Sequence, residues 1–257
     1  MMAVPSQRKT ILVTGASKGI GAEIAQRLLA DGAHVVAHYG SDRAGAEAAT
    51  AGAEAGHALL VGADLSDRAD TLRLWDEALA WRGRIDVLVN NAAVMPFDGG
   101  FDAADEAFEG AWDRALEVNV RGPARLIRAA VRHFLDHGGG DIVSLSSWAA
   151  QRGVTNPATI AYGASKAAVR SLTQSVARTY ARHGIRAYIV APGVVRTRLS
   201  ETFAETQGGA DKVSATLANG EWVEPAEVAR IVAFLASGAA PQLSGATLDV
   251  NGASYIR

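Results

Sequence analysis

The stretch TGASKGIG, residues 14–21, directly follows the apolar run TILVTG (10–15) and opens a segment with helical spacing. Gly15, Gly19 and Gly21 permit a tight turn there. They also let a phosphate approach backbone N–H groups at the helix N-terminus, where the helix dipole favours an anion. A tight strand-to-helix turn that binds nothing would use glycines in the same way. The strand before the loop and the helix after it favour a dinucleotide-binding loop.

Short apolar runs alternate with longer helical patterns along the rest of the chain. Their near-continuous apolar character is typical of strands buried on both faces of a parallel sheet. After the first run they are HVVAHY (34–39), HALLVGAD (57–64), IDVLVNN (85–91), DIVSLSS (141–147), RAYIVAP (186–192) and ATLDVNG (246–252). We predict a single α/β domain over residues 1–257. Its core is a Rossmann-type, doubly wound parallel sheet of about seven strands, with helices on both faces.

Two connections are long and of mixed polarity, at residues 94–110 and 197–222. Each follows the carboxyl end of a strand, which is where ligands bind in open parallel sheets. Both are either variable surface loops or binding loops. Residues 197–222 offer few core anchors, so we predict that they form a mobile substrate lid.

Tyr162 and Lys166 stand four residues apart in YGASK, within a predicted helix at 161–182, and therefore share one face of that helix. A nearby cation favours the phenolate of tyrosine, so the pair can donate or accept a proton near neutral pH. Such a pair also occurs as ordinary surface decoration. Here it follows DIVSLSS, whose serines could hydrogen-bond a substrate oxygen.

The composition excludes several classes of protein. Of the 257 residues 49% are apolar and 20% are charged, and the formal net charge is −2, which opposes general disorder and a basic nucleic-acid surface. Cysteine is absent, so disulfides, thiolate metal sites and cysteine nucleophiles are impossible. Among the histidines only His133 and His137 have a paired spacing, at a predicted helix end where histidine meets the dipole favourably. We expect no metal.

The sequence contains no apolar stretch near the roughly 20 residues that cross a bilayer. Its start, MMAVPSQRKT, lacks the apolar core of a signal peptide. We therefore expect a soluble, cytoplasmic protein that binds neither nucleic acid nor membrane.

The chain contains, in this order, TGASKGIG (14–21), NNAA (90–93), Asn119 in EVNV, Ser147 in LSS, YGASK (162–166) and PGVVRT (192–197). This set resembles the motifs of the classical short-chain dehydrogenase/reductase family over essentially the whole chain, including its 3-oxoacyl-(acyl-carrier-protein) reductase-like members. The resemblance implies a parallel sheet in the order 3-2-1-4-5-6-7, usually assembled as a homotetramer or homodimer. It also implies an NAD(P)-dependent oxidoreductase that transfers a hydride between a nicotinamide cofactor and a carbonyl or secondary alcohol.

By the same resemblance, Ser147 would orient the substrate oxygen and Tyr162 would exchange its proton. Lys166 would lower the pKa of the tyrosine and hold the nicotinamide ribose, and Asn119 would hold a water that links Lys166 to solvent. The segment from Ser147 to Tyr162 is longer than the family's commonest spacing, which leaves the adjacent Ser146 as an alternative. A non-catalytic dinucleotide-binding sensor on the same fold is the alternative function. The intact set of four residues favours the enzyme, because a sensor would not require it.

The end of the second predicted strand bears on the choice of cofactor. Tyr39, Gly40 and Ser41 stand there with no acidic residue before Asp42, whereas NAD-preferring relatives usually carry a carboxylate that repels a 2′-phosphate. Lys18 is placed to add a cation, and Arg43 to assist it. We therefore expect NADP(H) to be preferred, with NAD(H) possible. The alternative is that both cations are solvated and that Asp42 folds back onto the ribose.

The remaining residues of the expected site follow from the resemblance. Asp64 would contact the adenine, or would instead cap the following helix, and Leu65 would supply a backbone contact. The full set at the cofactor is Gly15, Ser17, Lys18, Gly19, Ile20, Gly21, Tyr39, Ser41, Asp64, Leu65, Asn91, Ala92, Ala93, Tyr162, Lys166, Pro192, Gly193, Val195 and Thr197. The substrate is a small molecule. Met95, Phe97 and Trp148 either line its pocket or belong to the core, and no charged clamp stands out.

Overall fold

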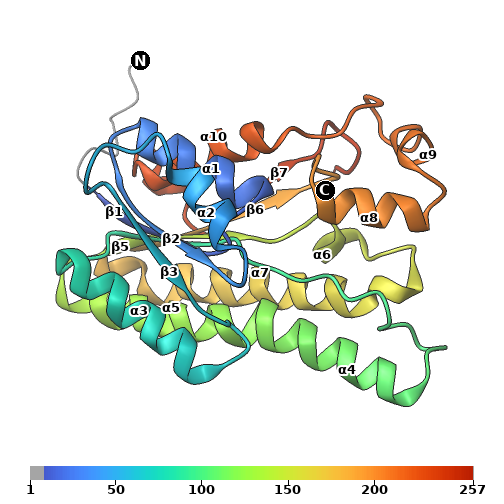
Figure 1. Cartoon of the computed structure of the whole chain (residues 1–257), viewed down its shortest axis with the longest axis horizontal. Coiled ribbons are helices and arrows are strands. Elements are labelled where there is room, and N and C mark those ends of the chain that lie inside the picture. The colour runs from blue at the N-terminus through green and yellow to red at the C-terminus, as the bar shows by residue number, and fades with distance from the viewer. Residues whose placement is uncertain (1–8, 257) are drawn as a thin grey trace.

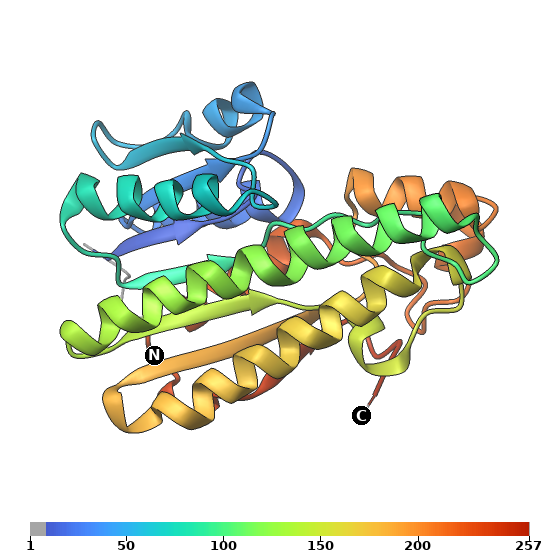
Figure 2. The same ribbon diagram turned by 90° about the horizontal axis from the view of Figure 1, so that it is seen from below.

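The computed structural model describes residues 9–256, which form one parallel seven-stranded sheet with helices on both faces (Figure 1; Figure 2). The strand order is β3-β2-β1-β4-β5-β6-β7. The strands are β1 (Thr10–Val13), β2 (His34–Tyr39), β3 (Ala58–Gly62), β4 (Val87–Asn90), β5 (Gly140–Leu145), β6 (Ile185–Pro192) and β7 (Thr247–Val250). The predicted doubly wound α/β fold is confirmed. The expectation for the first residues, MMAVPSQR, lies outside the part of the chain that the structure describes.

Burial on both faces explains why the strands read as continuous apolar runs. In β1, Ile11 and Val13 pack into one core while Leu12 packs into the other, and all three are fully buried. Two helices cover the first core and three cover the second. Figure 1 shows α1 and α10 above the sheet and α3, α5 and α7 below it.

The helices alternate with the strands along the chain. The longer ones are α1 (Gly19–Ala30), α2 (Arg43–Thr50), α3 (Arg68–Arg82), α4 (Asp105–Leu116), α5 (Gly122–Asp136), α7 (Ile160–Tyr180), α8 (Arg198–Thr206) and α10 (Pro225–Ala236). The shorter turns are a π-helical turn at Glu117–Arg121, α6 (Ala149–Arg152), α9 (Ala210–Ser214) and three 3₁₀ turns at Pro157–Thr159, Ala181–His183 and Pro241–Leu243.

The segment at residues 197–222 differs from the prediction. It contains α8 and α9 rather than an irregular loop. Ala204, Val213, Leu217 and Trp222 pack there with Val194 into a small hydrophobic cluster of their own. The expectation that this segment has few core anchors is therefore wrong, because its apolar residues pack on one another rather than on the sheet. The segment at 94–110 is irregular only as far as residue 104, and α4 begins at Asp105.

The order of the strands determines where a ligand can bind. The chain crosses from one half of the sheet to the other between β3 and β4, and β4 lies next to β1. In an open parallel sheet a crevice opens at such a switch point, outside the carboxyl ends of the strands. The glycine loop follows β1 and NNAA ends β4, so both predicted motifs border this crevice.

Candidate active site

The glycine loop is held by contacts that leave no room for side chains. Gly15 has φ +67°, and a Cβ on Gly21 would lie 2.0 Å from the carbonyl oxygen of Gly15. The side-chain amide of Asn91 donates to the carbonyl oxygens of Thr14 and Gly15 at 2.9 and 3.1 Å. Asn91 therefore acts as a positioning residue that joins the end of β4 to the loop.

His38 joins the same loop to β3. Its buried ring accepts a hydrogen bond from the Gly15 N–H on Nδ1 at 3.0 Å, and its Nε2 lies 3.0 Å from the carbonyl oxygen of Ala63. A neutral imidazole has one donor and one acceptor nitrogen, so these partners place the proton on Nε2. Burial lowers the pKa of His38 below its ordinary 6.5. Sequence reasoning missed this residue, although a histidine in the apolar run HVVAHY was a signal for it.

A groove of about 770 Å³ crosses the carboxyl edge of the sheet around this loop. Most residues predicted for the cofactor line it: Gly15, Ser17, Lys18, Gly19, Ile20, Gly21, Ser41, Asp64, Leu65, Asn91, Ala92, Ala93, Tyr162, Lys166, Pro192, Gly193, Val195 and Thr197. Tyr39 and Asn119 are not among the lining residues. Arg114 and His38 line the groove without having been predicted.

Residues at the end of β2 have partners within the chain. The Tyr39 ring packs against Gly62, where an added Cβ would lie 3.0 Å from ring carbons. The ring thus lies against β3, and its expected contact with the cofactor stays a prediction. The Asp42 carboxylate accepts from the Gly45 N–H at 2.9 Å and caps α2. Arg43 pairs with Glu47 at 2.8 Å on the exposed surface.

Asp64 lies in the groove and does not cap a helix. Its carboxylate accepts from the Ser66 hydroxyl at 2.7 Å and from the Ser66 N–H at 2.9 Å, and these bonds lower its pKa. The nearby charge of Arg114 acts in the same direction. The cap of α3 is Asp67, so the helix-cap interpretation of Asp64 is wrong.

The shape and chemistry of the groove fit a nicotinamide dinucleotide. A Cβ on Gly19 (φ +54°) would lie 3.1 Å from the Thr197 methyl, so only glycine leaves this narrow part of the groove open. The adjacent Lys18 is exposed and forms no ion pair with any residue between 9 and 256. The N-terminus of α1 thus offers backbone N–H groups and a free cation to phosphate.

Ser147, Tyr162 and Lys166 come together where the end of β5 meets α7. The Lys166 Nζ donates to the Leu145 carbonyl oxygen at 2.8 Å and lies 5.7 Å from the centroid of the Tyr162 ring. Burial lowers the pKa of Lys166 to about 8. Burial raises the pKa of Tyr162, and a hydrogen bond with Ser147 opposes that rise. The expected lowering by Lys166 is not found within the chain, because its ammonium bonds Leu145 and burial dominates.

The structure separates the two adjacent serines. The Ser146 hydroxyl donates to the carbonyl oxygen of Lys166 at 2.9 Å, so it is bound to the backbone of α7. The Ser147 oxygen accepts from the Ala149 N–H at 3.1 Å. Ser147 lines both the groove and a second cavity, whereas Ser146 lines only the groove.

Asn119 lies in the π-helical turn and holds two segments together. Its side-chain oxygen accepts from the Val94 N–H at 2.8 Å, and its amide donates to the Val94 carbonyl and the Ser165 hydroxyl. These bonds tie the segment after β4 to α7. Both ends of the side chain therefore have protein partners, and the expected role of Asn119 in holding a water that links Lys166 to solvent stays a prediction.

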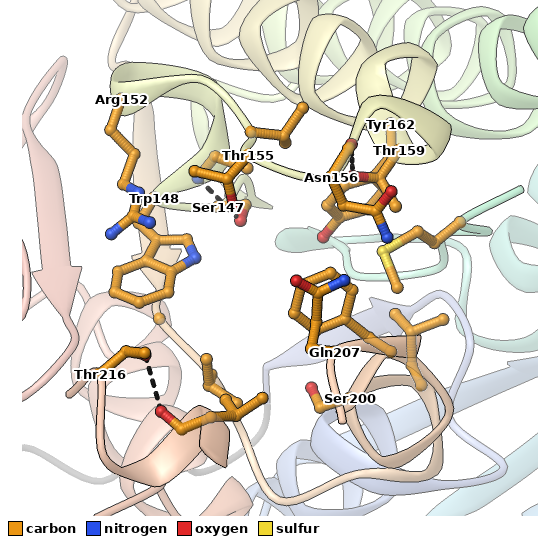
Figure 3. A pocket seen from close by; sticks show the side chains of 18 of the residues that line it. Ser147, Trp148, Arg152, Thr155, Asn156, Thr159, Tyr162, Ser200, Gln207 and Thr216 are labelled. Carbon is orange, nitrogen blue, oxygen red and sulfur yellow. Dashed lines mark hydrogen bonds between the residues drawn. The ribbon is translucent and has the colours of Figure 1, made fainter. Parts of the chain in front are cut away.

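The second cavity, of about 360 Å³, adjoins the groove (Figure 3). Ser147 and Tyr162 line both spaces and therefore stand at their junction. Met95 and Trp148 line the cavity and Phe97 lines the groove, which favours the pocket interpretation of these three residues. The outer wall comes from α8 and α9.

Comparison with known proteins agrees with this geometry. A sequence profile described as Enoyl-(Acyl carrier protein) reductase matches residues 15–253. Dehydrogenase/reductase SDR family member 4 of Bos taurus is 36% identical over 255 residues, which cover 97% of this chain and 88% of that protein. The chain belongs to the short-chain dehydrogenase/reductase family. It is accordingly an oxidoreductase of CH–OH and C=O groups that uses a nicotinamide cofactor.

Two further relatives resemble this short-chain dehydrogenase/reductase. Cis-4-hydroxycyclohexanecarboxylate dehydrogenase of Sinomonas cyclohexanicum is 40% identical over 250 residues, covering 95% of each chain. The crystal structure of 3-ketoacyl-(acyl-carrier-protein) reductase from Brucella melitensis complexed with NADH superposes with a TM-score of 0.86 at 31% identity. That likeness covers 98% of this chain and all of the other.

Two general features of the enzyme bear on its partners. Among residues 9–256 no helix is both long and apolar enough to span a membrane. Within the same residues no group of three histidine or acidic side chains is arranged to hold a metal. His133 accepts from the Ile85 N–H at 3.2 Å and stacks on His137, so both are engaged in the fold.

The buried, neutral His38 predicts a specific loss of stability in acid. The unfolded histidine takes up a proton below about pH 6.5, whereas the folded ring resists it, so the unfolded state binds more protons in that window. The free energy of unfolding should fall by at most about 1.4 kcal/mol for each pH unit below 6.5. Urea unfolding between pH 7.5 and 5 measures this slope. His38→Gln should lose part of the slope, whereas the exposed His183→Gln should keep it. An unchanged slope in His38→Gln contradicts the assignment.

Proposed function

We propose that this oxidoreductase interconverts a carbonyl compound and its secondary alcohol, with Tyr162 exchanging the proton and Ser147 orienting the reacting oxygen. The observation that carries the proposal is the place of these two side chains at the junction of groove and cavity. A substrate in the cavity would present its oxygen to both hydroxyls beside the cofactor groove. A sensor without catalysis needs no such adjoining cavity, so that alternative is not favoured.

The electrostatics of the site support proton transfer. Burial raises the pKa of Tyr162 and keeps its phenol protonated near neutral pH, as a proton donor to a carbonyl oxygen requires. Lys166, with its pKa lowered to about 8, is close enough to the working range to return that proton. When bound, the nicotinamide supplies or accepts the hydride. The glycine loop and Lys166 would hold it beside Tyr162.

We infer that NADPH is the preferred cofactor and that NADH remains possible. Lys18 offers a cation that has no ion-pair partner within residues 9–256, and Ser17 and Ser41 add hydroxyl donors to the groove. The first carboxylate after β2, Asp42, is engaged as a helix cap. The Brucella relative bound NADH, which is why NADH is retained for this chain.

The outer wall of the cavity supports the idea of a substrate lid within residues 197–222. Leu199 and Phe203 on α8 and Val213 on α9 line the cavity, so movement of these helices would open or close it.

Assembly as a homotetramer or homodimer is a further part of the proposal. Exposed Phe101, Leu135 and Phe234 offer apolar surface to a second copy of the chain.

Replacement of Tyr162 by phenylalanine tests the proton-transfer role. The variant should lose at least about 10²-fold in kcat, because proton transfer by a positioned side chain contributes roughly that much or more. Its dissociation constant for NADPH should stay within a few-fold of the parent. Tyr180→Phe, on the same helix but outside both spaces, is the matched control. Turnover of Tyr162→Phe close to that of the control would remove Tyr162 from the mechanism.

Replacement of Lys18 by alanine tests the cofactor preference. Only NADPH carries the extra phosphate, so the KM for NADPH should rise about tenfold while that for NADH changes little, as expected for one charge-assisted contact. Arg43→Ala is the control, because Arg43 already pairs with Glu47. Equal effects of Lys18→Ala on both cofactors, or a parent enzyme that prefers NADH, would overturn the preference.

A further inference from the structure

We propose that the substrate of this enzyme carries a carboxylate, which Arg152 and Lys212 hold while Ser147 and Tyr162 contact the reacting oxygen. The proposal rests on the proposed function, because it names the substrate class of the same site. Arg152 and Tyr162 lie on opposite sides of the cavity in Figure 3. One molecule can therefore reach both the catalytic pair and a cation.

The charge of the cavity is one-sided. Among the residues that the structure describes, Arg152 and Lys212 line it and no aspartate or glutamate does. Neither cation forms an ion pair or a side-chain hydrogen bond with another residue in the range 9–256. Two exposed cations without a counter-charge, facing a space lined by apolar and uncharged polar side chains, raise the local concentration of an anion.

Arg152 is held in a position that suits a carboxylate. Its guanidinium carbon lies 4.2 Å from the centroid of the Trp148 ring. The backbone N–H of Trp148 donates to the carbonyl oxygen of Pro192 at 3.0 Å, so the backbone that carries the ring is anchored to the end of β6. A guanidinium stacked on an indole keeps its N–H edge available, and that edge matches the two oxygens of a carboxylate.

Lys212 reaches the cavity from a separate element. It lies on α9, whereas Arg152 ends α6. A Cβ on Gly208 would lie 3.1 Å from Lys212 Cδ and 3.4 Å from its Nζ, so the lysine stem runs closely along this glycine. Gly208 has φ +93°, a conformation that other residues rarely adopt. The turn before α9 therefore provides the space in which the lysine lies.

The size and remaining walls of the cavity define the rest of the substrate. About 360 Å³ lies at the small end of the usual range for ligand sites, which is roughly 300–1,000 Å³. Val154, Leu199, Phe203 and Val213 make part of the wall apolar, while Asn156, Ser200, Gln207 and Thr216 make part of it polar without adding charge. The class that fits is a compact oxo acid or hydroxy acid. Arg152 stands in the long segment between Ser147 and Tyr162, so that segment gains a role in specificity.

The test compares acids with their neutral amides of nearly equal size. The substrates are 3-acetylbenzoate, 4-acetylbenzoate and 5-oxohexanoate, each beside its primary carboxamide. The parent enzyme should favour at least one acid over its amide in kcat/KM. Arg152→Gln should reduce that acid-to-amide ratio by about 10- to 100-fold, chiefly through the KM of the acid, as expected for a charge-assisted hydrogen bond. Arg152→Lys should retain part of the ratio, and Lys212→Gln should reduce it. Arg178→Gln, an exposed arginine outside the cavity, is the control.

Calorimetric titration with the same pairs measures the preference without turnover. An acid-over-amide preference in binding that Arg152→Gln abolishes supports the proposal even if no ketone is reduced, a result that would count against the proposed function alone. Absence of an acid preference across all pairs in both assays overturns the carboxylate proposal. So does an equal effect of Arg152→Gln on acids and amides. The Tyr162→Phe assay tests the proposed function separately, whichever result the comparison of acids and amides gives.

Discussion

The close approach of Gly21 to the carbonyl oxygen of Gly15 is the contact on which the rest of the site depends. Because a Cβ at Gly21 would lie 2.0 Å from that oxygen, α1 can begin directly against the end of β1 only with glycine there. Asn91 bonds the same carbonyl from β4, and His38 bonds the Gly15 N–H from β2. Three strands thus fix one loop. The groove at the switch point has its shape because of this packing.

The proposed catalytic groups depend on a second contact between elements, where the end of β5 meets α7. Ser147 follows the strand, and the helix carries Tyr162 and Lys166 at a spacing of one turn. Burial disfavours the charged form of both titratable side chains. It therefore raises the pKa of the Tyr162 phenol and lowers the pKa of the Lys166 ammonium. The two pKa values, which are ordinarily close at 10.0 and 10.5, are thereby moved apart, so the phenol stays protonated near neutral pH while the lysine loses its proton more readily. In the proposed function the groove would hold the cofactor at this point and the cavity would hold the substrate.

What the sequence could predict was local or periodic. The apolar run of β1, the glycine spacing and YGASK each carry their information within a few residues, so the fold and most groove residues followed from them. What escaped prediction depends on contacts distant in sequence. The bonds of His38 to Gly15 and Ala63 form only once three strands are aligned. The small cluster within residues 197–222 includes Val213 and Trp222, which lie outside the two cores of the sheet and so show no strand or long-helix period. The pair of cations was invisible because the fold alone brings α6 and α9 to one cavity.

The central claim is that a hydride passes between a nicotinamide in the groove and a carbon in the cavity. It is tested most directly by following deuterium from NADPH deuterated at both C4 positions, or from NADH treated in the same way, into the alcohol formed from the ketones named above. The account predicts one deuterium on the carbinol carbon, seen by mass spectrometry and by loss of the carbinol proton signal in NMR spectra. An alcohol product without deuterium, or no alcohol from any of these ketones while the cofactor is bound, would contradict it.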